Sequence, residues 1–332
     1  MSREVLILRE GDIRAVLDMR SCIAGVEAAF AAYSTGKAEL PAVIHLDIPE
    51  TQGEIHAKAG YIHGQAIYAA KFASGFPGNP RLGLPASDGL VLAFSAKNGA
   101  PEALMFDNGF ITDIRTGAAG GVAAQYMARE DAAVVSVLGT GAQARYQVDA
   151  LALVRPFEEV RVWGRDPERV RTCVEDLAAR PGIPQDARFL AAASPREAVE
   201  GAGIVITCTA SRDPLVEAGW LSPGVHLTAL GSDGPGKREL DPAVLDLADL
   251  LVVDSRQQSV ERGELQHAPD PDAAAKRASE LGEIVAGLRP GRTSDTQISV
   301  CDLTGIGVQD VAAASVTLSR ARENGLGERI SI

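Results

Sequence analysis

The sequence predicts an α/β protein of two domains, one a doubly wound parallel sheet and the other an α+β domain. The chain has 332 residues, and at roughly 150 residues per domain this length accommodates about two domains. From Asp131 onward, strand-like and helix-like segments alternate, a pattern typical of a parallel sheet covered on both faces. Before residue 115, consecutive strand-like runs with few helices between them indicate a mostly antiparallel α+β domain.

The composition excludes several classes of protein. A chain with 46% hydrophobic and 23% charged residues is too apolar for disorder, and 34 glycines with 18 prolines stay below the low-complexity range. The net charge of −12 repels nucleic acid and anionic lipid. No run approaches the ~20 apolar residues of a membrane span, and the opening MSREVLILREGDIR lacks the features of a secretion signal. We therefore expect a cytoplasmic protein with small-molecule partners and no nucleic-acid or membrane partner.

Cysteine and histidine spacing argues against disulfides and metals. The four cysteines form no CxxC pair and lie mostly in apolar segments, so we expect reduced core residues; they are Cys22, Cys173, Cys208 and Cys301. The five histidines include no HxxxH or HExxH pair. The sequence therefore predicts no metal site.

The N-terminal part begins with a predicted helix and continues as strands. Ser21 is the expected N-cap of a helix that ends near Tyr33. Strand-like runs then follow at residues 42–48, 54–62, 66–73, 89–96 and 101–107. An Ala-rich stretch, 110–129, predicts a long helix leading into the second domain. A second helix, 308–325, is expected near the C-terminus and could pack back on the first domain.

The second part begins with a strand, a glycine turn and a helix. The β-branched run AVVSVL, 133–138, stops at Gly139, and residues 143–154 then show apolar residues at helical spacing. Further predicted strands are 159–164, 188–191, 203–209, 225–230 and 249–254, and further predicted helices are 167–180 and 195–202.

The turn after the first of these strands is typical of a dinucleotide-binding site. Its sequence G-T-G-A-Q-A places Gly139 at the tight turn, Gly141 where the backbone would approach a pyrophosphate, and Ala144 where the helix packs closely on the sheet. The N–H groups of the helix N-terminus would bind the phosphates. The alternative is an ordinary tight turn between strand and helix.

The end of the next strand bears on which nicotinamide cofactor is used. An acid there favours NAD(H) through the ribose hydroxyls, whereas an arginine favours NADP(H) through its 2′-phosphate. The chain has Arg165 followed by Asp166. Arg165 favours NADP(H), Asp166 leaves NAD(H) open, and both residues could instead lie in a solvated loop.

Three charged residues stand where burial would be costly without a function. Lys71 interrupts the apolar run AIYAAKFA, Arg115 heads the Ala-rich helix, and Asp233 follows the strand VHLTAL, at the end of a parallel strand where ligands bind in open α/β sheets. Two cations suit the carboxylate of an amino or imino acid, and a carboxylate suits its nitrogen or a water. The alternative is that each belongs to a surface or interdomain ion pair.

These residues lie within segments that resemble the ornithine cyclodeaminase and mu-crystallin family nearly from end to end. The matching segments are KFASGFPGNP (71–80), DNGFITDIRTGAAGGVAAQYMAR (107–129), VLGTGAQA (137–144), LGSDGPGKREL (230–240), GELQHA (263–268), GEIVAGLRPGRTSD (282–295) and DLTGIGVQD (302–310). The subgroup that the chain most resembles is the bacterial ectoine-utilisation protein C, on RLGLP (81–85), HLDIPE (45–50) and VRPFEEVRVWGRD (154–166).

The resemblance implies a Rossmann-type nucleotide domain, residues 119–307, and a discontinuous substrate-binding and dimerisation domain, residues 1–118 with 308–332. It implies that Lys71 and Arg115 hold the substrate carboxylate, that Asp233, with Lys71, is catalytic and moves a proton, and that Thr304 contacts substrate. The cofactor, NAD(H) or NADP(H), would be lined by Arg115, Thr116, Gly139, Gly141, Ala142, Gln143, Arg165, Asp166, Thr209, Leu230, Gly231, Ser232 and Lys237. It also implies a homodimer.

Two departures from the family pattern bear on the substrate. His56 stands where ornithine-specific members have a glutamate that holds the distal amine, and His45 stands near the place of an arginine that binds the carboxylate. If both histidines face the pocket they contribute to substrate binding and specificity; they could equally be solvent-facing strand residues. The loss of the glutamate disfavours ornithine as substrate.

Three functions therefore compete. The leading one is a nicotinamide-dependent oxidoreductase acting on the C–N bond of an amino or imino acid, as an imine or ketimine reductase or an amino acid dehydrogenase. The second is a cyclodeaminase, a lyase that releases ammonia from a diamino acid, with ectoine degradation as a candidate setting. The third is a non-catalytic ligand-binding protein, which the presence of Asp233 disfavours.

Overall fold

The structure is a computed structural model that describes residues 3–184 and 186–332. The chain divides into two compact units, which we call the split unit (residues 1–115 and 306–332) and the central unit (residues 116–305). Each unit is built around its own eight-stranded sheet. The long helix α3 (Phe110–Met127) contains the point at which the chain passes from one unit to the other.

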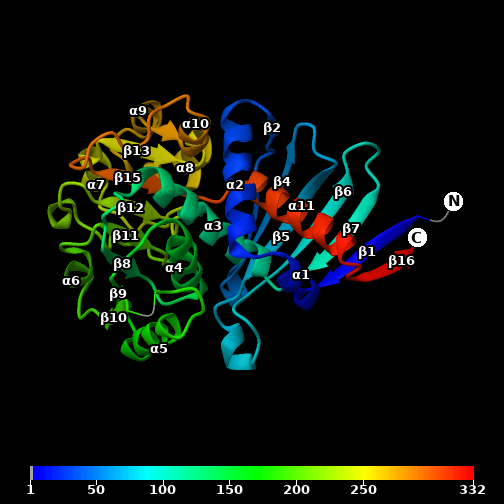
Figure 1. Cartoon of the computed structure of the whole chain (residues 1–332), viewed down its shortest axis with the longest axis horizontal. Coiled ribbons are helices and arrows are strands. Elements are labelled where there is room, and N and C mark those ends of the chain that lie inside the picture. Colours follow the sequence, from blue (N-terminus) through cyan, green and yellow to red (C-terminus); the bar gives the residue numbers. More distant parts are fainter. Residues whose placement is uncertain (1–2, 185) are drawn as a thin grey trace. The chain divides into compact units, whose positions relative to one another are not determined.

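The sheet of the split unit is mostly antiparallel, as expected. Its strand order is β16-β1-β7-β6-β5-β4-β2, with β3 also paired to β4, and β1 and β7 form its parallel pair. The strands are β1 (Glu4–Arg9), β2 (Ala38–Glu39), β3 (Ile44–Ile48), β4 (Gly53–Ile62), β5 (Ile67–Gly75), β6 (Ser87–Ser95), β7 (Pro101–Phe106) and β16 (Glu328–Ser331). The N- and C-terminal strands β1 and β16 lie side by side (Figure 1).

Two long helices pack beside this sheet. α11 (Gly307–Glu323) contacts α2 (Met19–Ser34), β4 and β5, so the C-terminal helix packs back on the first domain (Figure 1). A shorter helix, α1 (Glu10–Val16), also contacts α11. The prediction of Ser21 as N-cap was wrong: Asp18 caps α2 by accepting a hydrogen bond from the backbone N–H of Ser21, which itself lies in the first turn.

The sheet of the central unit is entirely parallel, which confirms the predicted fold class. Its order is β10-β9-β8-β11-β12-β15-β13-β14. The strands are β8 (Val134–Leu138), β9 (Glu159–Trp163), β10 (Arg188–Ala191), β11 (Ile204–Thr207), β12 (His226–Ala229), β13 (Leu250–Val253), β14 (Ser279–Glu280) and β15 (Ser299–Asp302). Strand order reverses at β8, and such a reversal is where ligands bind in open α/β sheets.

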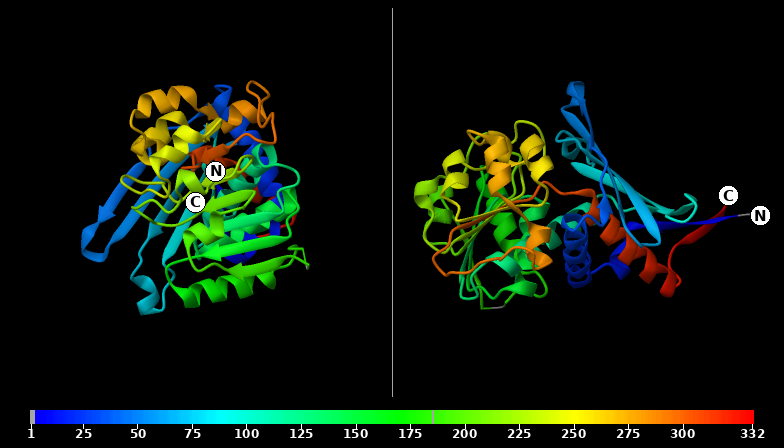
Figure 2. Two further views of the ribbon diagram at one scale, coloured as in Figure 1. Left: turned by 90° about the vertical axis from the view of Figure 1, so that its left-hand side faces the viewer. Right: turned by 90° about the horizontal axis from the view of Figure 1, so that it is seen from above.

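Helices lie on both sides of this parallel sheet (Figure 2). They are α3, α4 (Ala142–Val154), α5 (Pro167–Ala178), α6 (Pro195–Val199), α7 (Pro242–Leu247), α8 (Arg256–Arg262), α9 (Pro271–Arg277) and α10 (Leu281–Val285). Short 3₁₀ turns are η1 (Pro49–Thr51), η2 (Asn79–Leu82), η3 (Ala218–Trp220) and η4 (Glu264–His267). Strands covered on both faces are mostly apolar, and Val205, Leu227 and Val300 are accordingly fully buried in the core.

No helix within residues 3–184 and 186–332 is long and apolar enough to cross a membrane. The described cysteines form no disulfide; Cys22, Cys173 and Cys301 are buried and Cys208 is partly exposed. The same residues contain no cluster of three or more His, Cys, Asp or Glu side chains suited to a metal ion.

Candidate functional site

The glycine-rich turn between β8 and α4 has the backbone that a phosphate-binding turn requires. Gly139 has φ 137°, and a Cβ atom there would lie 2.8 Å from the carbonyl oxygen of Cys208. Gly141 is the N-cap of α4 in extended conformation, and no side chain caps this helix. Ala144 is fully buried. The first N–H groups of α4 are thus left for a ligand, as expected for a dinucleotide site.

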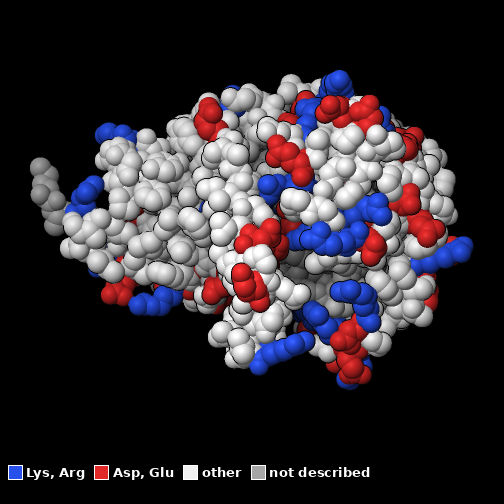
Figure 3. All heavy atoms as spheres, turned by 180° about the vertical axis from the view of Figure 1, so that it is seen from behind, with Lys and Arg blue, Asp and Glu red and all other residues white. Residues whose placement is uncertain are grey.

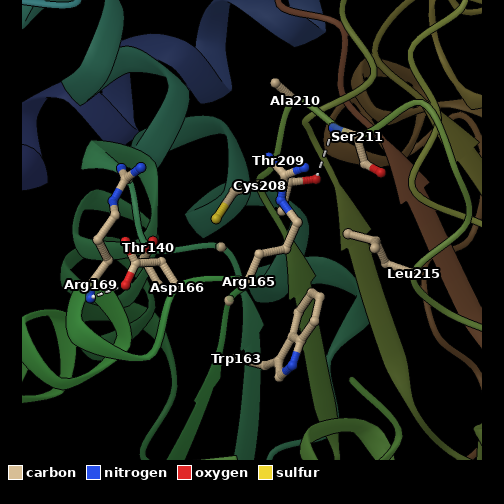
Figure 4. Close-up of a pocket in the computed structure, with 13 residues that line it drawn as sticks. Thr140, Trp163, Arg165, Asp166, Arg169, Cys208, Thr209, Ala210, Ser211 and Leu215 are labelled. Carbon is tan, nitrogen blue, oxygen red and sulfur yellow. Dashed lines mark hydrogen bonds between the residues drawn. The ribbon is translucent and has the colours of Figure 1, made fainter. Parts of the chain in front are cut away.

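A cavity of about 400 Å³ lies beside this turn, at the carboxyl ends of β8, β9 and β11 (Figure 4). It is lined by Gly139, Thr140, Gly141, Trp163, Gly164, Arg165, Asp166, Arg169, Cys208, Thr209, Ala210, Ser211 and Leu215. The predicted cofactor residues Gly139, Gly141, Arg165, Asp166 and Thr209 are therefore brought together. The lining does not include the other predicted cofactor residues of the central unit, Thr116, Ala142, Gln143, Leu230, Gly231, Ser232 and Lys237.

Two arginines and one aspartate gather at the start of α5 in this cavity. Asp166 is the N-cap of α5, and its carboxylate accepts hydrogen bonds from the backbone N–H groups of Glu168 and Arg169. Figure 4 shows Arg165 extending along the cavity and Arg169 standing on the first turn of α5. Capping occupies one oxygen of Asp166, whereas two guanidinium groups line the cavity. Sequence analysis missed Arg169, although its position three residues after an N-cap signal would have placed it in the first turn.

The ends of β11 and β12 are held together by a buried carboxylate that sequence analysis also missed. Glu239 accepts hydrogen bonds from the backbone N–H groups of Thr209 (2.6 Å) and Gly231 (2.8 Å) and from the hydroxyl of Thr207 (2.7 Å). At Gly231 a Cβ atom would lie 2.0 Å from the carbonyl oxygen of Thr209. Glycine is therefore needed at this close approach.

Asp233 lies in the turn that follows β12, as expected. Its carboxylate is 2.8 Å from the ammonium group of Lys237, and its side chain is 40% exposed. The hydroxyl of Ser232 donates a hydrogen bond to the backbone carbonyl of Lys237. This bond joins the two ends of the turn that carries Asp233. The structure thus pairs two residues that the family resemblance assigns to catalysis and to cofactor binding.

The predicted substrate residue Thr304 lies in a polar network of the central unit. Its hydroxyl donates to Asp254 (2.8 Å) and accepts from the side-chain amide of Gln258 (3.0 Å). The residue is nearly fully buried. The donor capacity of this hydroxyl is therefore committed to Asp254.

Asp302, at the end of β15, is a fully buried acid in the same unit. It accepts hydrogen bonds from the hydroxyl of Ser259 and from the backbone N–H of Glu264. Burial, together with the charge of Asp254, raises the pKa of Asp302 to about 8, well above the usual range of an aspartate. A proton is therefore held in the folded state over a pH range in which the unfolded chain has released it.

Because the folded-state pKa of Asp302 is raised, this group lowers the free energy of unfolding as pH rises from about 4 to 8. The full effect of one such proton is about 1.4 kcal/mol per pH unit. We expect D302N to remove this slope, so that the variant gains stability relative to the wild-type chain between pH 5 and 8. Urea unfolding at four pH values measures the effect, and parallel curves for the two proteins would contradict it.

Lys71 and Arg115 meet in the split unit, where they share one carboxylate oxygen. Oδ1 of Asp310, in the first turn of α11, accepts from Nζ of Lys71 at 2.9 Å and from Nε of Arg115 at 3.1 Å. Arg115 also donates to the side-chain oxygen of Gln309 at 2.7 Å. Lys71, Arg115 and Asp310 are each at most 5% exposed. Lys71, Arg115 and Asp310 therefore form one buried charged cluster, and the alternative of separate surface ion pairs is disfavoured for the two cations.

Burial and charge act in opposite directions within this cluster. Burial, aided by the neighbouring charge of Arg115, lowers the pKa of Lys71. Although burial works to raise it, the charges of Lys71 and Arg115 hold the pKa of Asp310 below its usual value. Burial raises the pKa of Asp107, whose carboxyl accepts from the backbone N–H of Ile111. Two basic side chains therefore share one carboxylate oxygen, an arrangement that leaves them able to bind a further anionic group.

Three polar atoms around this cluster are buried without a hydrogen-bond partner among the described residues: Oδ2 of Asp310, Nε2 of Gln309 and Oδ1 of Asp107. Leaving a buried donor or acceptor unsatisfied costs about 1–3 kcal/mol. Such atoms are commonly satisfied by a ligand or by water. Two acceptors and one donor beside buried cations suit a molecule that carries both a carboxylate and a nitrogen.

His45 and His56 lie on the same face of the sheet as Lys71. In the register of β4 and β5, Lys58 is opposite Lys71, and His56, two residues before Lys58, shares its face. His45 is opposite His56, with its Nδ1 3.0 Å from Nε2 of His56. Lys58 and His56 are buried. The interpretation of these histidines as solvent-facing is therefore disfavoured for His56.

The histidine pair is flanked by acids. Nε2 of His45 is 3.1 Å from Oδ1 of Asp47, and Nε2 of His56 is 3.8 Å from Oε2 of Glu54. Going outward along the strands, this face therefore carries first Lys58 and Lys71, then the two histidines, and then Asp47 and Glu54. Sequence analysis missed Lys58, although the period-two alternation of β4 places it beside His56.

Comparison with known proteins identifies the family of the chain. Residues 3–325 match the model of the ornithine cyclodeaminase/mu-crystallin family. The chain belongs to this family. The uncharacterized cyclodeaminase y4tK of Sinorhizobium fredii is 42% identical over 328 residues, which cover 97% of each chain.

Two solved structures of family enzymes match the whole chain. A dimeric archaeal alanine dehydrogenase with bound NAD has a TM-score of 0.90 at 33% identity and covers 99% of both chains. The Thermococcus litoralis Δ¹-pyrroline-2-carboxylate reductase, in complex with NADH and L-proline, has a TM-score of 0.91 at 32% identity over 98% of this chain and 100% of its own. The predicted enzyme class, which spans nicotinamide-dependent reductases and cyclodeaminases, is confirmed for the family to which the chain belongs.

Proposed function

We propose that the chain reduces the C=N bond of an imino acid with NAD(P)H. The observation that carries this proposal is the sharing of one carboxylate oxygen of Asp310 by the buried cations Lys71 and Arg115. Such a cluster suits the carboxylate of an imino acid, because ammonium and guanidinium groups form charge-assisted hydrogen bonds with carboxylates. The NADH and L-proline bound to the Thermococcus reductase support the same class of reaction.

Different residues would bind the cofactor, hold the substrate carboxylate and transfer the proton. The turn at Gly139 and Gly141 fits a pyrophosphate, since the N–H groups of α4 are uncapped. The cofactor would supply the hydride that is added to the imine carbon. Lys71 and Arg115 would hold the substrate carboxylate, and Asp233 would transfer the proton that the reduction consumes at nitrogen. Lys237, 2.8 Å from Asp233, would hold the Asp233 carboxyl group in position.

The second candidate is a cyclodeaminase acting on a diamino acid. Asp47 and Glu54, beside the histidine pair, place negative charge where a distal ammonium group could be held, although His56 replaces the usual glutamate. Sequence identity favours neither candidate, since the cyclodeaminase y4tK and a putative dehydrogenase of Rhizobium meliloti are both 42% identical to the chain. For this function we propose ectoine degradation as the setting, on the residues shared with the ectoine-utilisation subgroup.

One assay separates the two candidates. The purified protein is given cyclic imino acids, or 2-oxo acids with amines, together with NADH or NADPH, and separately 2,4-diaminobutyrate, ornithine or lysine with NAD⁺. Absorbance of the reduced cofactor and release of ammonia are followed together. Net oxidation of the cofactor by an imino acid supports the reductase. Ammonia release without net change in the cofactor would reject it in favour of the cyclodeaminase.

We propose NADP(H) as the preferred cofactor, because Arg165 and Arg169 both line the cavity while Asp166 caps α5. A charge-assisted hydrogen bond contributes about 1.5–3 kcal/mol. We therefore expect R165A to weaken NADPH binding roughly tenfold or more while changing NADH binding by less than about threefold. Fluorescence titration of both cofactors measures this. Equal losses for the two cofactors would contradict the preference.

We also propose that the split unit forms a homodimer through its sheet. Large apolar side chains are exposed on this sheet, namely Ile44 (64%), Leu46 (52%), Phe72 (46%), Phe106 (46%) and Ile330 (43%). On the face shown in Figure 3, the split unit has more white surface and fewer blue or red side chains than the central unit. Exposed apolar patches of this kind mark association surfaces, and the related alanine dehydrogenase is dimeric. Sedimentation of the wild-type chain and of F72E tests the proposal, and a monomeric wild-type chain would reject it.

A further inference from the structure

Arg145, in the first turn of α4, reaches back to the glycine-rich turn that precedes its own helix. Its Nη1 donates to the backbone carbonyls of Thr140 (3.0 Å) and Gly141 (3.1 Å). Its Nε donates to Oδ2 of Asp176 on α5 at 2.9 Å, and Nη2 donates to the same oxygen. The side chain of Arg145 is only 18% exposed. One side chain therefore joins the turn, α4 and α5.

These contacts determine where the N–H groups of the turn point. In a trans peptide unit, the carbonyl of one residue and the N–H of the next point in opposite directions. Since the carbonyls of Thr140 and Gly141 are bound by Arg145, the N–H groups of Gly141 and Ala142 are directed away from it. Gly141 lines the cavity beside the turn, and these are the N–H groups at the uncapped start of α4.

The positive charge of Arg145 is electrostatically unfavourable at this end of α4. A cation near a helix N-terminus opposes the helix dipole. The first turn of α4 contains no acidic residue that would offset it. The compensating carboxylate comes instead from Asp176, on the neighbouring helix. A neutral residue would avoid this cost, but it could not bind two carbonyls and Asp176 at once.

We infer that Arg145 is a positioning residue for the cofactor: by holding two carbonyls of the glycine-rich turn, it aims the N–H groups of Gly141 and Ala142 at the pyrophosphate. The inference rests on the proposed use of a nicotinamide dinucleotide. It assigns Arg145 no contact with the reacting atoms. Asp176 has the secondary role of holding the guanidinium group in place and balancing its charge.

The test measures binding of ADP-ribose, which carries the pyrophosphate and lacks the nicotinamide ring. Isothermal titration is done on the wild-type 332-residue chain and on R145Q, R145K and D176N. R171Q is the matched control, because Arg171 lies on α5, is 63% exposed and is paired only with acids of its own helix in the described contacts. Thermal midpoints and hydrogen exchange of the peptide spanning residues 137–146 are recorded for each protein.

We expect R145Q to weaken ADP-ribose binding roughly tenfold, the equivalent of one charge-assisted hydrogen bond. R145K, which keeps the charge but not the planar fork, should recover only part of this loss, and D176N should lose less than R145Q. Residues 137–146 should exchange faster in R145Q, while its thermal midpoint stays within a few degrees of that of R171Q.

Two results would overturn the inference. Unchanged ADP-ribose affinity in R145Q would show that the turn keeps its geometry without the guanidinium group. A loss of affinity that is matched by a large fall in the thermal midpoint would show a purely structural role. Failure of the wild-type chain itself to bind ADP-ribose would instead reject the dinucleotide cofactor, and the inference with it.

Discussion

Replacement of Asp233 by asparagine is expected to lower kcat by a factor of about 10³, because general acid–base catalysis typically contributes 10²–10⁴-fold. Asparagine is the same size and its side-chain oxygen can still accept from Lys237, which is 2.8 Å away. It cannot exchange a proton at nitrogen. Affinity for the reduced cofactor should therefore change by less than about threefold, since the turn keeps its shape.

The control for D233N is D213N, which removes an exposed carboxylate from another loop of the central unit. Initial rates with an imino acid and fluorescence titration of the cofactor are measured for both variants. A near-normal kcat in D233N would remove Asp233 from the acid–base role. Equal losses in both variants would point to a general effect of charge.

Replacement of Asp310 by asparagine should give the largest loss of stability among these variants. The change keeps the shape of the side chain but leaves Lys71 and Arg115 as buried cations without their shared counter-ion. Removing one partner of a buried ion pair costs about 3–5 kcal/mol. We expect a loss near the lower limit, because an amide oxygen can still accept hydrogen bonds from both cations.

Urea unfolding followed by circular dichroism measures this loss of stability. The control is E328Q, which breaks the pair between Glu328 and Arg9, whose side chains are 58% and 68% exposed; exposed pairs contribute about 0–1 kcal/mol. D310N should also raise KM for the substrate, because the cations it aligns are those proposed to bind the carboxylate. Stability within about 0.5 kcal/mol of the wild-type value would show that Asp310 does not hold the cluster together.

Local patterns in the sequence predicted most strands and helices of the central unit. They failed where the order of the strands in the sheet differs from their order along the chain. The alternation of strand and helix from Val134 onward predicted the parallel sheet, and the glycine spacing predicted the turn before α4. β15, the last strand of this unit along the chain, lies between β12 and β13. Sequence analysis did not predict it, because a four-residue buried strand has no periodicity of its own.

The N-cap of α2 is a second feature that local sequence patterns did not predict correctly. Asp18 and Ser21 are both good capping residues, three positions apart in one stretch of sequence. Which of them caps α2 depends on where the backbone leaves the extended conformation, and in the structure that residue is Asp18. Propensity alone does not separate the two.

The sequence by itself determined the fold class, the family and the residue types available for the chemistry, because hydrophobic periodicity, glycine spacing and charged interruptions are properties of short segments. Only the tertiary structure decided which residues meet. Asp310 lies 239 positions from Lys71, and Glu239 lies 32 positions from Thr207. Such pairs have no local signal, since the free energy that joins them is gained only when distant segments pack and exclude water.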